Sequence, residues 1–228
     1  MIVTRRGMTW EVDEPTPTAP YTEGPFPGFW KQWEAENWEN DTLEVLDRFV
    51  RPGSTFVDLG ACIGAHSMGC AERGADVVAV EPDRVAFEFL SRHVERNVPG
   101  KVRCVHGALA DYNGTCELSS HPQGWATAMS SVIRYEASEA TETVPCFTLE
   151  RLFENYSIED CCLVKMDIEG MEALVLETVA PFLAERGIPL HLSTHEPWWP
   201  SPVDPAWFDG FSHVEGTLGG MEHFVAVP

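Results

Sequence analysis

The sequence predicts an α/β fold in which helices cover a mostly parallel β-sheet. Short apolar runs rich in Val and Ile, typical of buried strands, alternate with longer stretches whose apolar residues recur every three or four positions, as in helices. Glycine or acidic residues follow several of these runs, at the sheet edge where open parallel sheets bind ligands. With 228 residues, 44% of them hydrophobic and 22% charged, the chain is long enough to form one such core.

Residues 1–40 are predicted to form an N-terminal arm or lid, and residues 41–228 the main domain. Proline, threonine and acidic residues are frequent up to Pro27, and this composition favours an arm over a core element. Trp30, Trp33 and Trp38 follow closely, and three large rings are costly to expose to water. The end of the arm is therefore expected to meet the core.

The central elements are predicted from their hydrophobic periodicity. Leu43, Leu46 and Val50 lie on one face of a helix that begins at Asp41 and ends before Pro52. Strands and helices then alternate, with strands at 55–60, 76–81 and 101–106 and helices at 65–73 and 83–97. This order is typical of right-handed crossovers between parallel strands.

The second half is predicted to complete the sheet. Residues 111 to about 144 are rich in Ser and Thr with little periodicity, which indicates a loop over a site. Regular elements then return, with helices at 148–156 and 171–185 and strands at 162–168 and 189–194. Two final short strands, at 211–215 and 222–227, flank a glycine-rich turn and predict a closing hairpin.

The first predicted ligand-binding segment joins a buried strand to a helix. It reads Val-Asp-Leu-Gly-Ala-Cys-Ile-Gly from Val57 to Gly64, and Glu81 ends the next strand. Glycines let the backbone approach a ligand, and the amino end of the helix favours a negative group. The carboxylate of Glu81 can accept hydrogen bonds from both ribose hydroxyls. A nucleotide site is therefore expected here, with a glycine turn of some other α/β fold as the alternative.

The glycine spacing favours S-adenosylmethionine (SAM) over a dinucleotide. A pyrophosphate requires Gly-x-Gly-x-x-Gly, but Cys62 takes the place of the second glycine. SAM has an adenosine for Glu81 and no phosphate, so a loop with fewer glycines suffices. Asp58 would then lie near the sulfonium and the ammonium. His66, in the first turn of the following helix, is equally open to a functional or a structural role.

A second group of acids follows the strand at 162–168. Asp167 and Glu169 lie where the sheet ends, and they can orient a substrate hydroxyl, take its proton or hold a divalent cation. For Glu172 we prefer the simpler interpretation of an acid favoured by the helix dipole. His195 follows the next strand and is a candidate base, because its reference pKa of about 6.5 leaves it mostly neutral at pH 7.

These segments together resemble the FkbM family of SAM-dependent methyltransferases. The resemblance runs from about Trp38 to Glu196, and it rests on Lys-Met-Asp-Ile-Glu-Gly-Met-Glu at 165–172, Phe-Val-Asp-Leu-Gly-Ala-Cys-Ile-Gly at 56–64, Trp38-Glu39, and Ala108-Leu109-Ala110-Asp111 with Gly114. It implies a class I, Rossmann-like fold with a seven-stranded, mostly parallel sheet, helices on both faces and a C-terminal antiparallel hairpin. It also implies O-methylation of a hydroxyl on a sugar, glycolipid or natural product.

The resemblance also implies roles for individual residues. The catalytic candidates are Asp167, which would face the methyl group, with Glu169 and His195. The residues expected at the cofactor are Asp58, Gly60, Cys62, Gly64, Glu81, Ala108, Trp38 and Glu39. Cys62 stands where the family more usually has Asn, a change that backbone contacts survive. A divalent cation held by Asp167 and Glu169 is possible but not favoured, because residues two apart need not point the same way.

Charge and cysteine usage narrow the expected partners. The chain has 15 Lys and Arg against 36 Asp and Glu, a net charge of −21 that repels nucleic acids and anionic membranes. No apolar stretch is long enough to span a bilayer. Seven scattered cysteines without Cys-x-x-Cys spacing predict free thiols, and with no export signal the expected location is the cytoplasm. A small-molecule hydroxyl acceptor is the expected partner.

Two other functions stay open at this point. One is an NAD(P)-dependent oxidoreductase, disfavoured by the missing glycine and the lack of a Tyr-x-x-x-Lys pair. The other is a catalytically silent methyltransferase fold that binds a partner, disfavoured by the intact Asp58, Glu81 and Asp167.

Overall fold

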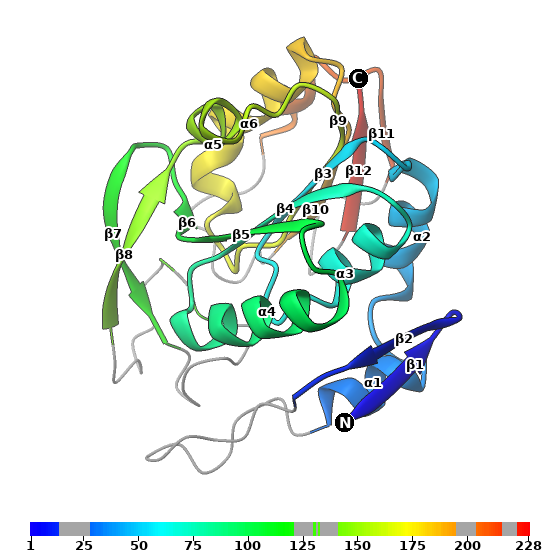
Figure 1. Cartoon of the computed structure of the whole chain (residues 1–228). Coiled ribbons are helices and arrows are strands. Elements are labelled where there is room, and N and C mark those ends of the chain that lie inside the picture. Colours follow the sequence, from blue (N-terminus) through cyan, green and yellow to red (C-terminus); the bar gives the residue numbers. More distant parts are fainter. Residues whose placement is uncertain (14–27, 121–129, 131, 133–140, 195–203, 216–222) are drawn as a thin grey trace.

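A computed structural model describes residues 1–13, 28–120, 130, 132, 141–194, 204–215 and 223–228 (Figure 1). Its centre is a seven-stranded sheet, in the order β11 (His213–Glu215), β12 (His223–Val227), β10 (Leu190–Ser193), β9 (Cys161–Met166), β3 (Thr55–Leu59), β4 (Asp76–Glu81) and β5 (Val102–His106). From β10 to β5 all neighbours are parallel, whereas β12 runs antiparallel to both β10 and β11. The predicted fold class, with its closing hairpin, is confirmed.

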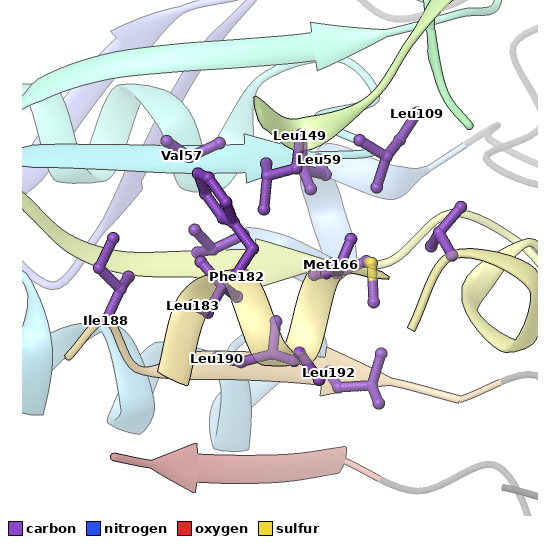
Figure 2. Packing of buried hydrophobic residues seen from close by; sticks show 14 of the residues in the cluster. Val57, Leu59, Leu109, Leu149, Met166, Phe182, Leu183, Ile188, Leu190 and Leu192 are labelled. Atoms are coloured by element: carbon purple, nitrogen blue, oxygen red, sulfur yellow. The ribbon is translucent and has the colours of Figure 1, made fainter. Parts of the chain in front are cut away.

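Helices cover both faces of this sheet because alternate residues of each strand point to opposite sides. Val57 and Leu59 of β3 belong to a core cluster with α5 (Leu149–Tyr156) and α6 (Glu172–Glu185). Figure 2 shows Phe182 and Leu183 of α6 on the same side of the sheet as Val57 and Leu59. Phe56 belongs to a second cluster on the other face, with α2 (Asn40–Phe49), α3 (Ala65–Glu72) and α4 (Arg84–Asn97).

The N-terminal segment packs into this second cluster. β1 (Ile2–Arg5) and β2 (Met8–Glu11) form an antiparallel hairpin, which lies beside the short helix α1 (Phe29–Glu34) (Figure 1). Its inward side chains Val3 and Trp10 are buried. The expectation of an arm outside the core is therefore wrong for residues 1–13, where alternating inward residues form a strand pair. The domain division near residue 40 stays a prediction.

A small second sheet lies where the sequence predicts a loop. β6 (Ala108–Leu109) pairs in parallel with β8 (Thr141–Phe147), and β7 (Gly114–Ser119) pairs with β8 antiparallel. The loop prediction is thus wrong at both ends of the segment from residue 111 to 144. The physical reason is an alternation of small apolar residues, which the polar composition obscures. The inward-facing residues are Ala108, Ala110, Cys116, Leu118, Val144 and Cys146.

No helix in the described part of the chain has the length and apolarity needed to cross a bilayer.

Candidate active site

A cavity of about 500 Å³ lies at the carboxyl ends of the central strands. Its walls come from the segments that follow β3, β4, β9 and β10, from the start of the small sheet, and from α1 and the turn after it. The strand register explains this convergence, because parallel neighbours end at the same edge of the sheet. Eight of the predicted site residues line it, namely Trp38, Glu39, Gly60, Cys62, Glu81, Ala108, Asp167 and Glu169.

Glu81 lies at the end of β4, as expected for a ribose acceptor. Its Oε2 accepts a hydrogen bond from the Cys62 backbone N–H at 2.8 Å, and its Oε1 accepts one from the Asp83 N–H at 2.8 Å. Burial raises the pKa of Glu81 to about 8, and the nearby Asp83 carboxylate adds to the effect, although the two backbone N–H groups oppose it. The carboxyl group therefore fixes the loop after β3 and is poised to lose a proton near neutral pH.

An added side chain at either predicted glycine would meet neighbouring atoms, most severely at Gly60. A Cβ on Gly60, whose φ is +78°, would lie 1.8 Å from the backbone oxygen of Asp167. A Cβ on Gly64 would meet a Leu90 methyl at 2.7 Å, and Gly64 does not line the cavity. From the sequence, both glycines are expected to allow close approach of a ligand, and this stays a prediction. Gly60, which lines the cavity, also lets the ends of β3 and β9 approach each other, so the two loops lie side by side.

Asp58 is buried behind the cavity wall and does not line it. Its Oδ2 accepts a 2.6 Å hydrogen bond from the Ser67 hydroxyl, and its Oδ1 lies 3.4 Å from the Nζ of Lys165. Lys165 in turn lies 3.5 Å from Oδ2 of Asp167, which does line the cavity. Asp58 therefore reaches the site through Lys165.

Lys165 lines the cavity and is a site residue that the sequence did not single out. Its side chain is only 3% exposed. Burial alone would lower its pKa, but the carboxylates of Asp167, Asp58 and Glu39 outweigh that effect and raise the pKa, so the ammonium stays charged. The sequence does contain a sign of this role, because Lys165 interrupts the apolar run of β9. A charge buried in a strand requires a partner of opposite charge. The register places that partner directly across, with Asp58 opposite Lys165.

Glu172 orders the loop that carries the catalytic candidates. Its two carboxylate oxygens accept hydrogen bonds from the Ile168 N–H at 2.9 Å and the Gly170 N–H at 2.8 Å. This agrees with the interpretation of Glu172 as an acid at the start of a helix. Asp167 and Glu169 both line the cavity, as do Ser193 and Thr194 at the end of the neighbouring strand β10. His195 lies outside the described residues.

A further part of the cavity wall is formed by Trp38, Glu39 and His66. The Trp38 indole N–H donates to Oε1 of Glu39 at 2.7 Å, and Oε2 of Glu39 lies 3.6 Å from Nε2 of His66. Burial, helped by the charge of Lys165, lowers the pKa of His66 to about 4, so this imidazole is neutral at pH 7. His66 thus belongs to the cavity wall as a neutral polar group.

Cys62 adopts a left-handed backbone conformation with φ of +51° and lines the cavity. Burial, reinforced by the Glu81 charge, raises the pKa of its thiol, which is therefore protonated at neutral pH. No cluster of three or more His, Cys, Asp or Glu side chains suited to a metal ion occurs among the described residues. The disfavoured cation stays untested.

The strand order of the main sheet, its antiparallel strand β12 and the cavity at the strand ends define a class I methyltransferase-like fold. A sequence profile described as the methyltransferase FkbM domain matches residues 58–198. The chain therefore belongs to the FkbM methyltransferase family, as the sequence resemblance predicts.

Two curated relatives are similar over part of their length. The hexuronic acid methyltransferase AglP of Haloferax volcanii is 27% identical over 139 residues, 61% of this chain and 55% of AglP. The ribosomal protein L11 methyltransferase of Pelotomaculum thermopropionicum is 41% identical over 71 residues, 30% of this chain and 23% of that protein. The chain thus spans little more than half of one and less than a quarter of the other.

A solved structure agrees with the fold. The crystal structure of WbdD superposes with a TM-score of 0.53 at 12% identity, covering 92% of this chain and 45% of that one.

Proposed function

We propose that this protein transfers the methyl group of SAM to a hydroxyl group of a small molecule. The observation that carries the proposal is the cavity itself. It joins the loop after β3 and the buried Glu81 carboxyl to the acids Asp167 and Glu169 within one space of about 500 Å³. A cofactor site and a reaction site are thereby contiguous.

The residues of the cavity fit SAM. Glu81 offers carboxyl oxygens at the strand end where a ribose is expected, and the loop from Gly60 to Ile63 forms the adjoining wall. The carboxylates of Glu39, Asp167 and Glu169 suit a ligand that carries a sulfonium and an ammonium group. When bound, SAM supplies an electrophilic methyl group.

Asp167 is the residue best placed to orient the acceptor. Its carboxylate is paired with the Lys165 ammonium, which fixes its position at the end of β9. An acceptor hydroxyl that donates a hydrogen bond to Asp167 would be held in line with the methyl group of SAM. Orienting two reactants in this way provides much of the rate enhancement of a bimolecular reaction. The base that removes the proton is still predicted to be His195, on the segment after β10.

The acceptor is proposed to be a sugar or a sugar-containing small molecule. The support is the family membership together with AglP, which is named for a hexuronic acid substrate. Mass spectrometry of small molecules that copurify with the protein, followed by a methyl-transfer assay on hexoses and hexuronic acids, tests the acceptor class.

Calorimetry tests the cofactor. We expect SAM and S-adenosylhomocysteine (SAH) to bind, and Glu81→Ala to weaken both about tenfold to 150-fold, the effect of losing roughly 1.5 to 3 kcal/mol from a hydrogen bond to a charged group. Glu88→Ala, on the exposed face of α4, is the matched control and should bind as the wild type does.

Each alternative function has its own outcome. Tight NADH binding with no heat from SAM would overturn the cofactor assignment and favour the oxidoreductase. Normal SAM binding without methyl transfer to any acceptor would favour the silent binding protein.

A further inference from the structure

We propose that Arg5 is a positioning residue of the active site, and that the N-terminal hairpin acts through it to hold Trp38 and Glu39 in the cavity wall. This inference rests on the proposed function, because it assigns Glu39 to cofactor binding. It adds a part of the chain that lies outside the matched family domain, which begins at residue 58.

Arg5 projects from β1 into the protein, where only 3% of the residue is exposed. Its guanidinium carbon lies 4.3 Å from the centre of the Trp33 ring. Its Nη2 donates to the backbone oxygen of Trp38 at 3.0 Å and to the side-chain oxygen of Asn40. One cation thus contacts α1 and the turn that leads from α1 into α2.

A buried arginine carries a cost that an apolar residue at the same position would not. The Nε and Nη1 groups of Arg5 are buried with no hydrogen-bond partner among the described residues, which costs free energy. An apolar side chain would fill the same space without that cost. A buried arginine at this position is therefore better explained by what its Nη2 group holds in place.

The turn that Arg5 holds is strained. Glu36 and Glu39 both have left-handed backbone conformations, with φ of +57° and +43°, although neither is a glycine. Such conformations persist where surrounding contacts enforce them. The contacts here are the two Arg5 hydrogen bonds and a 2.7 Å hydrogen bond from the Asn40 side-chain amide to the Glu36 backbone oxygen.

The strained turn places two side chains at the cavity. Trp38 and Glu39 both line it, and the Trp38 indole fixes one oxygen of the Glu39 carboxylate at 2.7 Å. The other oxygen lies 3.6 Å from His66. A carboxylate held in this way attracts the ammonium of a bound cofactor. Without Arg5 the turn can relax, and Glu39 would lose its fixed position.

A double-mutant cycle on SAH affinity tests the proposal. Arg5→Met keeps the apolar stem and removes the donors, and Glu39→Gln removes the charge. Each single change is expected to weaken binding about tenfold or more. The double variant should bind about as weakly as the weaker single variant, because both changes remove one interaction. A role confined to stability would leave the affinity of the folded variants unchanged.

The neighbouring arginine provides the matched control. Arg6 lies on the same hairpin, but its side chain makes a surface ion pair with Asp47 at 2.7 Å. Arg6→Met should bind SAH as the wild type does. Arg5→Lys keeps a charged donor and should recover most of the affinity lost in Arg5→Met. If Arg5→Met does not fold, Arg5→Gln, which is polar but too short to reach both acceptors, replaces it in the cycle.

The outcomes separate the two proposals. No SAH binding by the wild-type protein would overturn the proposed function. If the wild type binds SAH but Arg5→Met binds equally well, or the two single effects multiply in the double variant, Arg5 does not act through Glu39 and the inference fails.

Discussion

Glu81 shows how one buried side chain links folding to ligand binding. The folded protein raises its pKa from 4.5 to about 8, mainly by burial. Between these values the folded state holds a proton that the unfolded chain has released. The contribution of Glu81 to stability is therefore fully present below about pH 4.5 and is lost as the pH rises towards 8.

Ligand binding should reverse this protonation. Ribose hydroxyls that donate to Glu81 favour its charged form, so SAH binding at pH 7 is expected to release up to one proton and to tighten as the pH rises from 7 to 9. Calorimetry in buffers with different ionisation enthalpies measures the proton count. Glu81→Gln should bind without this release, and proton uptake by the wild type would contradict the assignment.

The side chains of Asp58 and Lys165 form a buried ion pair at the site. Asp58 and Lys165 lie opposite each other in adjacent strands, and each is almost completely buried. Removing Lys165 would leave the Asp58 carboxylate buried without this counter-charge, a kind of loss that typically costs about 3 to 5 kcal/mol, whereas removing Asp58 would leave Lys165 paired with Asp167. Asp58 therefore supports the site through Lys165 even though it does not reach the cavity.

At the scale of elements, the contact between β3 and β9 decides whether the site forms. Gly60→Ala would push a methyl group into the Asp167 backbone oxygen, whereas Gly53 has a similar positive φ and no atom of the described residues within 4 Å of an added Cβ. We expect Gly53→Ala to cost about 1 to 2 kcal/mol from backbone strain alone and Gly60→Ala about 4 kcal/mol or more. Urea unfolding of both variants measures the difference, and equal losses would mean that the strand ends can separate freely.

The elements differ in how well the sequence predicts them. The apolar runs of β3, β4 and β9 and the periodic faces of α4 and α6 predict those elements almost to the residue. The sequence does not predict β1, β2 and β7, because the apolar residues that point inward alternate with polar ones. The polar composition of the surrounding segments then favours a loop or an arm over a strand. Short edge elements depend on the core they meet more than on their own sequence.

At the scale of the whole molecule, the net charge of −21 limits the range of acceptors. Binding to nucleic acid draws most of its affinity from the release of counterions by Lys and Arg. We expect no RNA or DNA binding at micromolar protein and physiological salt. Filter binding of a structured RNA and a DNA duplex over a salt series checks this, and binding that weakens steeply with salt would reveal a basic groove.

The sequence by itself determined the fold class, the family and the main polar residues expected at the site. Local apolar patterns encode strands and helices, and acids or glycines placed after strands of a parallel sheet must share one edge. Asp167, Glu169 and Glu81 were found in this way, Glu39 was implied by the family resemblance, and all four line the cavity.

Only the tertiary structure decided which charges meet and why certain residues are needed. The ion pair between Asp58 and Lys165 joins residues more than a hundred positions apart, and the strand register sets it. Arg5 reaches Trp38 because the hairpin folds against α1. Gly60 is needed because the backbone carbonyl of Asp167, just after β9, lies against it. Such contacts depend on the distances between elements, and the hydrophobic periodicity of one segment carries no information about those distances.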